Sequence, residues 1–256
     1  MTMIDRAQFE NLGGVSNGTS AHYSRTIMLS ELKLLLDATS SQASVDDYRK
    51  AVVENNCLQK DTVETRKISY NKLKLLYSLD PDNRLFYLFR TLYQREPDEL
   101  ALLAYLCAYC RDYVLRAGCN YLQTILPGTE IPNTFFSQCI EDMGPGKCSA
   151  ATLNSASRNL IATFYKTGHL GGNKIHKVRA QAVAGPASVT YAAAIAYALG
   201  ERGLYLCDNE FVKALDCSKE KALGLLADAD IKGLIRFRHL GEVMDVQFLC
   251  AEGIIL

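Results

Sequence analysis

A long apolar segment in the middle of the chain constrains the fold most. Residues 98–117, which include LALLAYLCAYCRDYVLRA, carry too few polar side chains for a surface helix and indicate one continuous buried helix that stops at Gly118. The chain has 256 residues, of which 48% are hydrophobic and 22% are charged, so it is long enough to build a core around such a helix. This composition is typical of a globular protein and excludes collagen-like, disordered and small disulfide-rich classes.

Helical periodicity and helix-stop residues predict further helices on both sides of this segment. They cover residues 23–37, 45–54, 61–79, 83–94, 133–143, 150–167, 187–199, 209–215 and 219–229. Residues 1–20 are rich in Gly, Ser and Asn and are expected to form a flexible lead-in. Two β-rich runs flank Leu240-Gly241, which predicts a hairpin. The predicted fold class is therefore mainly α, with helix-turn-helix and winged-helix-like units and a small α+β C-terminal extension.

Three domains are predicted from these elements. Residues 1–97 form a helical domain with a helix-turn-helix-like pair, residues 98–200 form a helical domain with a winged-helix-like unit, and residues 201–256 form a helix–helix–hairpin extension. The longest apolar run, 187–199, is shorter than the ~20 residues that a membrane-spanning helix needs. The N-terminus lacks the apolar core of a secretory signal. We therefore expect a cytoplasmic protein without a membrane partner.

The nine cysteines are expected to be structural. Without a secretory signal, a disulfide framework is not expected. Cys107 and Cys110 have the spacing of a metal or redox pair, but they lie inside the apolar helix and no second close Cys/His pair follows. Core positions are predicted for both, with a metal or redox role as the alternative.

No group of residues predicts catalysis. The sequence has no glycine-rich phosphate loop, no GxSxG motif and no paired-histidine metal motif, and its four histidines are scattered. We therefore expect a protein that is not an enzyme and that uses no cofactor, no metal and no small-molecule substrate.

The charges are distributed unevenly along the chain. The 28 basic residues balance the 28 acidic ones overall, but the 58 residues from Met143 to Gly200 contain six basic residues and no Asp or Glu. This stretch therefore carries +6 and the remainder −6. Such asymmetry predicts a surface that binds a polyanion such as a nucleic acid. An ordinary solvated surface is the alternative.

The order of elements in this acid-free stretch is that of a winged helix-turn-helix. A short helix, a Gly-Pro-Gly turn, the helix 150–167 and the basic segment KIHKVR follow one another. On the helix, Leu153, Ala156, Leu160, Ile161 and Phe164 share one face. The opposite face and the basic segment carry the predicted DNA-binding residues, which are Ser155, Arg158, Asn159, Lys166, Lys174, Lys177 and Arg179. A plain αα-hairpin without nucleic acid has the same order and is the alternative.

A second candidate lies nearer the N-terminus. Helix 45–54, turn 55–58 and helix 61–77 also have helix-turn-helix order. The spacing of Lys67, Asn71 and Lys74 places them on one side of the second helix. The predicted DNA-binding residues here are Lys60, Arg66, Lys67, Asn71 and Lys74. A lysine-rich surface helix without a ligand is the alternative.

Four stretches of the chain resemble BrxA, the family of small accessory proteins of BREX bacteriophage-defence systems. They are TSAHYSRTIMLSELKLLL, DYRKAVVENNCLQKDTVETRK, LALLAYLCAYCRDYVLR and SASRNLIATFYKTGHL, and together they cover about residues 19–185. The resemblance lies in patterns of spacing and includes no catalytic signature. Family members end near the position of residue 200, so the later residues form an extension on which the resemblance carries no information.

The resemblance implies a mostly helical protein that is similar to the antitermination factor NusB and binds double-stranded DNA. It implies no catalytic activity, and it makes other BREX proteins possible partners. A NusB-like RNA-binding module and a structural adaptor that recruits other defence proteins are the alternative functions. An Arg- and Asn-bearing recognition helix favours duplex DNA, whereas aromatic residues on a basic face would favour RNA.

Overall fold

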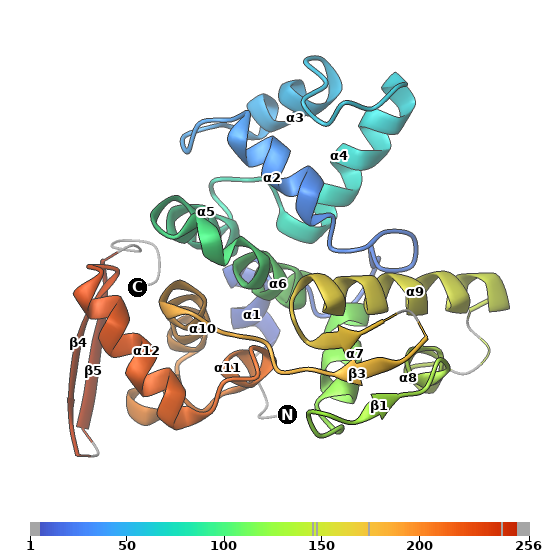
Figure 1. Cartoon of the computed structure of the whole chain (residues 1–256). Coiled ribbons are helices and arrows are strands. Elements are labelled where there is room, and N and C mark those ends of the chain that lie inside the picture. The colour runs from blue at the N-terminus through green and yellow to red at the C-terminus, as the bar shows by residue number, and fades with distance from the viewer. Residues whose placement is uncertain (1–5, 145, 147, 174, 242, 250–256) are drawn as a thin grey trace.

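The computed structural model describes residues 6–144, 146, 148–173, 175–241 and 243–249 (Figure 1). Helices dominate this part of the chain, which confirms the predicted mainly-α class. The α-helices are α1 Arg6–Leu12, α2 Leu29–Asp37, α3 Val45–Val53, α4 Val63–Tyr77, α5 Arg84–Arg95, α6 Leu100–Arg111, α7 Tyr113–Leu122, α8 Phe135–Asp142, α9 Ala150–Lys166, α10 Pro186–Ala198, α11 Glu210–Ala214 and α12 Lys219–Ile231. Two short 3-10 helices are η1 Pro97–Glu99 and η2 Gly203–Leu206.

Helix α6 is the centre of the core. Every residue from Leu102 to Cys110 is buried, and α2, α4, α5, α7 and α10 all pack against this helix (Figure 1). Because α6 is apolar on all sides, only a surrounding shell of helices removes its surface from water. The apolar core is continuous from Leu35 through Tyr105 and Ala192 to Leu226, and it crosses both predicted domain boundaries.

The predicted continuous helix 98–117 is wrong, because the chain breaks at Asp112. The backbone of this residue is extended (φ −122°, ψ 106°), and its carboxylate accepts hydrogen bonds from the backbone N–H groups of Val114 (3.1 Å) and Leu115 (3.0 Å). An aspartate in this position caps the next helix, so the chain turns and starts α7. The apolar pattern concealed this cap.

The predicted flexible lead-in, residues 1–20, is also wrong where the structure describes it. Helix α1 buries Phe9 and Leu12, and Arg116 donates hydrogen bonds to the carbonyls of Val15 (2.7 Å) and Ser16 (3.2 Å). The helix expected over 23–37 begins only at Leu29, because the preceding residues form a segment that is bound between α7 and α9.

A three-stranded antiparallel sheet lies beside α7, α8 and α9. Its strands are β1 Glu130–Ile131, β2 Leu170–Gly172 and β3 Lys177–Arg179, in the spatial order β1-β3-β2. The register pairs Glu130 with Val178 and Leu170 with Arg179. Along the chain the order is α7, β1, α8, α9, β2, β3, with a tight hairpin between the last two strands. We call the elements from α7 to β3 the winged-helix-like unit, because two helices are followed by a two-stranded hairpin.

The C-terminal extension has the predicted order of two helices and a hairpin. Strands β4 Ile235–Leu240 and β5 Val243–Phe248 pair in antiparallel register, and every second residue of β5 is buried. Helix α12 packs against both α10 and β4, so the extension continues the core. Figure 1 shows the hairpin at the opposite edge of the molecule from α8 and α9. Within the described ranges, no helix is long and apolar enough to cross a membrane.

Candidate nucleic-acid interface

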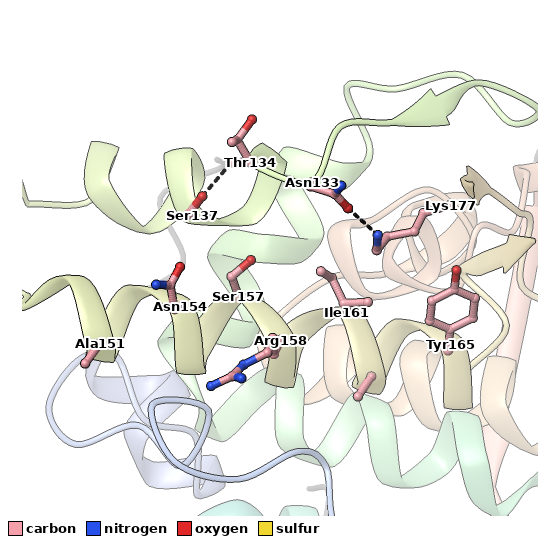
Figure 2. Close-up of a pocket in the computed structure, with 11 residues that line it drawn as sticks. Asn133, Thr134, Ser137, Ala151, Asn154, Ser157, Arg158, Ile161, Tyr165 and Lys177 are labelled. Atoms are coloured by element: carbon pink, nitrogen blue, oxygen red, sulfur yellow. Dashed lines mark hydrogen bonds between the residues drawn. The ribbon is translucent and has the colours of Figure 1, made fainter. Parts of the chain in front are cut away.

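A groove of about 950 Å³ runs between α8 and α9 (Figure 2). Five of its eleven lining side chains are short and polar and two are cationic, while Ala151, Ile161, Ala162 and Tyr165 supply apolar surface. The lining residues are Asn133, Thr134, Ser137, Ala151, Asn154, Ser157, Arg158, Ile161, Ala162, Tyr165 and Lys177. The groove therefore combines hydrogen-bonding groups with positive charge, a chemistry that suits phosphates and sugars.

Helix α9 forms one wall because both its cap and its core face are fixed. The Ser149 hydroxyl accepts a hydrogen bond from the backbone N–H of Thr152 (3.2 Å), which starts the helix. Leu160 and Phe164 are fully buried, and Leu160 lies so close to α7 that a Cβ on Gly118 would be 3.0 Å from its Cδ1. The glycine thus permits α7 and α9 to cross closely. Because the Leu160 and Phe164 face of α9 packs against α7, the opposite face of α9 is directed to solvent.

The outer face of α9 supplies the groove. Asn154, Ser157 and Ile161 project from α9 toward α8 in Figure 2. Arg158 is exposed, and among the described residues it has no acidic side chain within ion-pair distance. The half-buried Ala162 leaves room beside it. Arg158 can therefore form an ion pair with an anionic ligand, because no described acidic side chain neutralises it.

The opposite wall is the N-terminal turn of α8. The Thr134 side chain makes no capping hydrogen bond, and the Ser137 hydroxyl donates to the Thr134 carbonyl (2.8 Å). From β3, the Lys177 ammonium donates to the Asn133 side-chain oxygen. Positive charge and the partial positive charge of a helix N-terminus therefore lie at the same end of the groove.

The hairpin between β2 and β3 is held against α9. The Tyr165 hydroxyl donates a hydrogen bond to the Asn173 carbonyl (2.8 Å), and the Asn173 side chain accepts from the backbone N–H groups of Ile175 and His176 (both 2.8 Å). Gly172 has φ +85°, and a Cβ there would lie 2.2 Å from the His176 carbonyl oxygen, so the turn needs a glycine. The hairpin therefore has a defined position relative to α9.

The seven residues predicted on helix 150–167 and the basic segment differ in how far the structure leaves them accessible to a ligand. Arg158 and Lys166 are exposed, and Ser155 is half-buried. Lys177 is only 7% exposed and lines the groove, while Lys174 lies outside the described residues. The other two are occupied inside the protein. Asn159 donates to the His22 carbonyl (2.9 Å), and Arg179 is 3% exposed and paired with Asp216.

The placement of Arg179 on a phosphate-binding surface is therefore corrected. Its guanidinium contacts the Asp216 carboxylate with two nitrogens, and it also donates to the His169 carbonyl (3.1 Å). A buried and paired arginine is not available to a phosphate. The alternation of apolar and basic residues in the segment gave no indication of this partner, which lies 37 residues later.

The second predicted cluster, around α4, also contains both exposed residues and residues that are bonded within the protein. Lys67, Asn71 and Lys74 are exposed and lie at helical spacing on α4. Lys60 forms an ion pair with Glu31 (3.2 Å). Arg66 donates to backbone carbonyls (3.3 and 3.4 Å) that include that of Val53. Two lysines and one asparagine of this cluster therefore remain at the surface.

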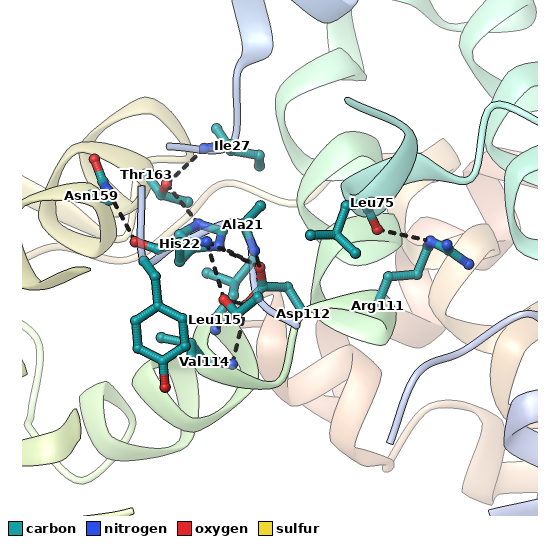
Figure 3. A network of polar contacts seen from close by, with 12 residues as sticks. Ala21, His22, Ile27, Leu75, Arg111, Asp112, Val114, Leu115, Asn159 and Thr163 are labelled. Carbon is teal, nitrogen blue, oxygen red and sulfur yellow. Dashed lines mark hydrogen bonds and ion pairs between the residues drawn. The ribbon is translucent and has the colours of Figure 1, made fainter. Parts of the chain in front are cut away.

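A buried polar network joins the N-terminal segment to α7 and α9 (Figure 3). The His22 ring contacts the Asp112 carboxylate with Nδ1 (3.0 Å) and the Thr163 hydroxyl with Nε2 (3.1 Å). Burial raises the pKa of Asp112, but the charge of His22 and hydrogen bonds from His22, Ser20 and the Leu115 N–H outweigh it, so the pKa lies well below its ordinary value. This carboxylate is therefore held in its charged form.

The hydroxyl–imidazole–carboxylate order of this network resembles an acid–base triad. However, His22 and Thr163 are completely buried, and the Thr163 hydroxyl also accepts a hydrogen bond from the Ile27 N–H (3.0 Å). The arrangement therefore positions residues 20–27 and leaves no room for a substrate. The scattered histidines of the sequence gave no indication of it.

The cysteine pair of α6 lies in the core, as predicted. Cys107 and Cys110 are fully buried, and burial raises the pKa of the Cys107 thiol to about 11. Among the residues that the structure describes, no group of three or more His, Cys, Asp or Glu side chains is arranged to hold a metal ion.

No protein-family model matches this chain, and no curated protein is detectably similar to it in sequence.

Proposed function

We propose that this protein is a non-enzymatic component of a BREX-type phage-defence system that binds double-stranded DNA through its winged-helix-like unit. The observation that carries the proposal is Arg158 on α9, which is exposed and has no ion-pair partner among the described residues. It lies beside a groove, lined in part by polar and cationic side chains, that α8 and β3 complete. In helix-turn-helix units the second helix contacts the DNA, and α9 has that place in the chain order. The defence role rests on the resemblance of the sequence to the BrxA family.

The electrostatics of the unit support a polyanionic ligand. The acid-free stretch keeps Arg158 and Lys166 at the surface, and Lys177 is in the groove wall. Arg179 contributes no net charge to the surface because Asp216 neutralises it. Phosphate contacts by two or three cations give binding that is salt-dependent and weakly sequence-specific.

The groove also offers uncharged contacts of the kind found at DNA backbones. Asn154 and Ser157 on α9 face Asn133 and Ser137 across it. Short hydroxyl and amide side chains and helix N-termini commonly bind phosphate oxygens and fix the orientation of the protein on the duplex. Tyr165 is half-buried and its hydroxyl is bonded to Asn173, so base stacking receives less support than backbone contact.

The experiment is a fluorescence-anisotropy titration of the full chain with one sequence as duplex DNA, single-stranded DNA and RNA at several salt concentrations. The R158Q/K166Q variant should bind duplex DNA more weakly. Its plot of log K against log salt should be shallower by about 0.9 for each lost phosphate contact. The matched control is K219Q/K221Q, which removes the same charge from α12 on the other side of the molecule.

The outcomes distinguish the candidate DNA sites and the alternative functions. Equal affinity and slope in wild type and R158Q/K166Q would exclude the winged-helix-like unit as the DNA site. A loss confined to K67Q/K74Q would move the site to α4, where these lysines are exposed. Preference for RNA over the duplex would favour the NusB-like alternative. Failure of all three nucleic acids to bind would favour the adaptor.

The defence role has a separate test. Deletion of the gene from a host that carries the system should restore phage plaques, and the wild-type gene should again suppress them. We expect R158Q/K166Q to fail in this complementation while K219Q/K221Q succeeds. Undiminished resistance in the deletion strain would contradict the assignment to defence and leave the DNA-binding result unaffected.

A further inference from the structure

A second, smaller cavity lies away from the α8–α9 groove, between α5 and the loop that joins α2 to α3. Its volume is about 150 Å³, and it is lined by Ser41, Gln42, Tyr48, Pro81, Phe86, Tyr87, Arg90, Thr91 and Gln94. Arg90 is the one charged side chain in this lining, and the others include two hydroxyls of Ser and Thr, two Tyr hydroxyls and two amides. No acidic residue is among them.

Arg90 is only 7% exposed, and its hydrogen bonds are incomplete. One terminal nitrogen, Nη2, donates to the carbonyls of Leu36 (3.0 Å) and Thr39 (2.7 Å) at the C-terminal end of α2. The Nε atom is buried and has no acceptor. Within the described ranges, no carboxylate lies at ion-pair distance from this guanidinium.

The nearby acidic residues are already bound elsewhere. The Asp37 carboxylate forms an ion pair with Lys33 (2.6 Å) and accepts a hydrogen bond from the Tyr93 hydroxyl (3.3 Å). The Asp47 carboxylate accepts hydrogen bonds from the Ser44 backbone N–H (2.9 Å) and the Ser44 hydroxyl (2.7 Å) in a capping box. Neither carboxylate therefore forms an ion pair with Arg90, although the pKa of Asp37 is lowered mainly by the hydrogen bond from Lys33 and to a smaller extent by the charge of Arg90.

A buried guanidinium with no carboxylate at ion-pair distance is costly unless other groups compensate its charge. The Leu36 carbonyl at the negative end of α2 and the Thr39 carbonyl just beyond it supply part of that compensation. They leave Nε without an acceptor, and the cavity beside this side chain is lined by hydroxyl and amide groups that can donate hydrogen bonds. We propose that this cavity binds a small oxyanion of the phosphate type, with Arg90 as its charged anchor.

The size of the cavity limits the ligand. Sites for drug-sized molecules have volumes of about 300–1,000 Å³, so a cavity of about 150 Å³ suits inorganic phosphate or the phosphate end of a small monoester. Either ligand would join α5 to the α2–α3 loop and stabilise the N-terminal helices. The inference is independent of DNA binding, because none of the residues of this cavity lines the α8–α9 groove.

The test is the thermal midpoint of the full chain, titrated with phosphate, sulfate, glycerol phosphate or chloride at constant ionic strength. Phosphate should raise the midpoint of the wild-type protein progressively and chloride should not, because a ligand of the native state stabilises it by mass action. A rise with phosphate and not with glycerol phosphate would identify the free ion as the ligand. Rises with both would identify the phosphate group itself.

Three variants locate the effect. T91L places a larger apolar side chain in the cavity and leaves the bonds from Arg90 to α2 in place, so we expect it to weaken the apparent phosphate affinity at least about tenfold. R90Q should abolish the phosphate-dependent rise of the thermal midpoint. If R90Q does not fold, the result for T91L tests the proposal. R158Q should respond like the wild type, because its residue lies in the other groove. An unchanged response in T91L, a response lost in R158Q, or no phosphate-specific rise in the wild type would each overturn the proposal.

Discussion

The Arg179 guanidinium and the Asp216 carboxylate form a buried bidentate ion pair. Nη1 of Arg179 lies 2.8 Å from Oδ2 of Asp216, Nη2 contacts Oδ1, and the two side chains are 4% and 7% exposed. The same carboxylate accepts a hydrogen bond from the Ala182 N–H (3.0 Å). The pair joins β3 of the winged-helix-like unit to the turn after α11, so the C-terminal extension completes the environment of this unit.

Substitution D216N should therefore destabilise the whole chain. It leaves the Arg179 charge buried without a counterion, and breaking a buried pair in this way typically costs about 3–5 kcal/mol. Urea unfolding monitored by circular dichroism at neutral pH measures the change. We expect a lower midpoint with an unchanged slope, because the folded architecture stays the same.

The control is D208N. Asp208 forms an ion pair with Lys213 (2.7 Å), but both side chains are at least half exposed. Pairs of this kind contribute about 0–1 kcal/mol. Equal effects of D208N and D216N would show that the buried pair has no special role in stability.

Local signals were sufficient to predict many of the elements. Helix α9 was predicted over 150–167 and spans Ala150–Lys166, because an apolar face and the capping Ser149 are both visible in the sequence. The β4–β5 hairpin was predicted around Leu240-Gly241 from two β-rich runs, and Gly241 adopts the positive φ of a turn residue. These features depend on residues that are close together in the chain.

The errors arose where a partner lies far away in the sequence. Asp112 ends α6 because it accepts hydrogen bonds from Ser20 and Ala21, more than 90 residues earlier, as well as from α7. Residues 20–27 form a turn and a loop instead of a helix because α7 and α9 hold them, although the sequence from Tyr23 on is compatible with a helix. Apolar periodicity carries no information about such partners.

The candidate interface was predicted in part for the same reason. Arg158 and Lys166 follow from the charge pattern on α9, and both are exposed. The opposite wall of the groove, with Asn133, Thr134 and Ser137, was missed because these residues carry no charge and precede the acid-free stretch. Their role depends on the packing of α8 beside α9, which only the structure shows.

Thiol chemistry gives a second prediction. Because the pKa of the buried Cys107 thiol is raised to about 11, its thiolate fraction at neutral pH is roughly a hundredfold below that of an ordinary thiol. Cys148, just before α9, is only half-buried. Brief alkylation of the native protein with iodoacetamide, followed by peptide mass spectrometry, should modify Cys148 and leave Cys107 and Cys110 unmodified.

The same alkylation after unfolding in urea is the control, and all three cysteines should then react. Rapid labelling of Cys107 in the native protein would contradict its core position. It would also revive the alternative that the Cys107–Cys110 pair has a metal or redox role.

The third prediction concerns acid stability and Asp112. The pKa of this carboxyl is lowered in the native protein, so the charged form contributes stability above its ordinary pKa, and the contribution is lost as the pH falls. The wild-type free energy of unfolding should therefore decrease between about pH 5 and pH 3. D112N removes the charge that faces His22 and leaves one acceptor oxygen for bonds that the two carboxylate oxygens share in the wild type. It should cost on the order of 3 kcal/mol at neutral pH.

The decisive measurement is the difference between the two proteins across the pH range, from urea unfolding at each pH. D112N should lose less stability than the wild type between about pH 5 and pH 3, so the two curves should converge in acid. D61N, which changes an exposed aspartate before α4, should run parallel to the wild type. Parallel curves for D112N and the wild type would mean that Asp112 is not held charged by its contacts with His22 and Ser20. The acid sensitivity would then have to arise from other carboxylates.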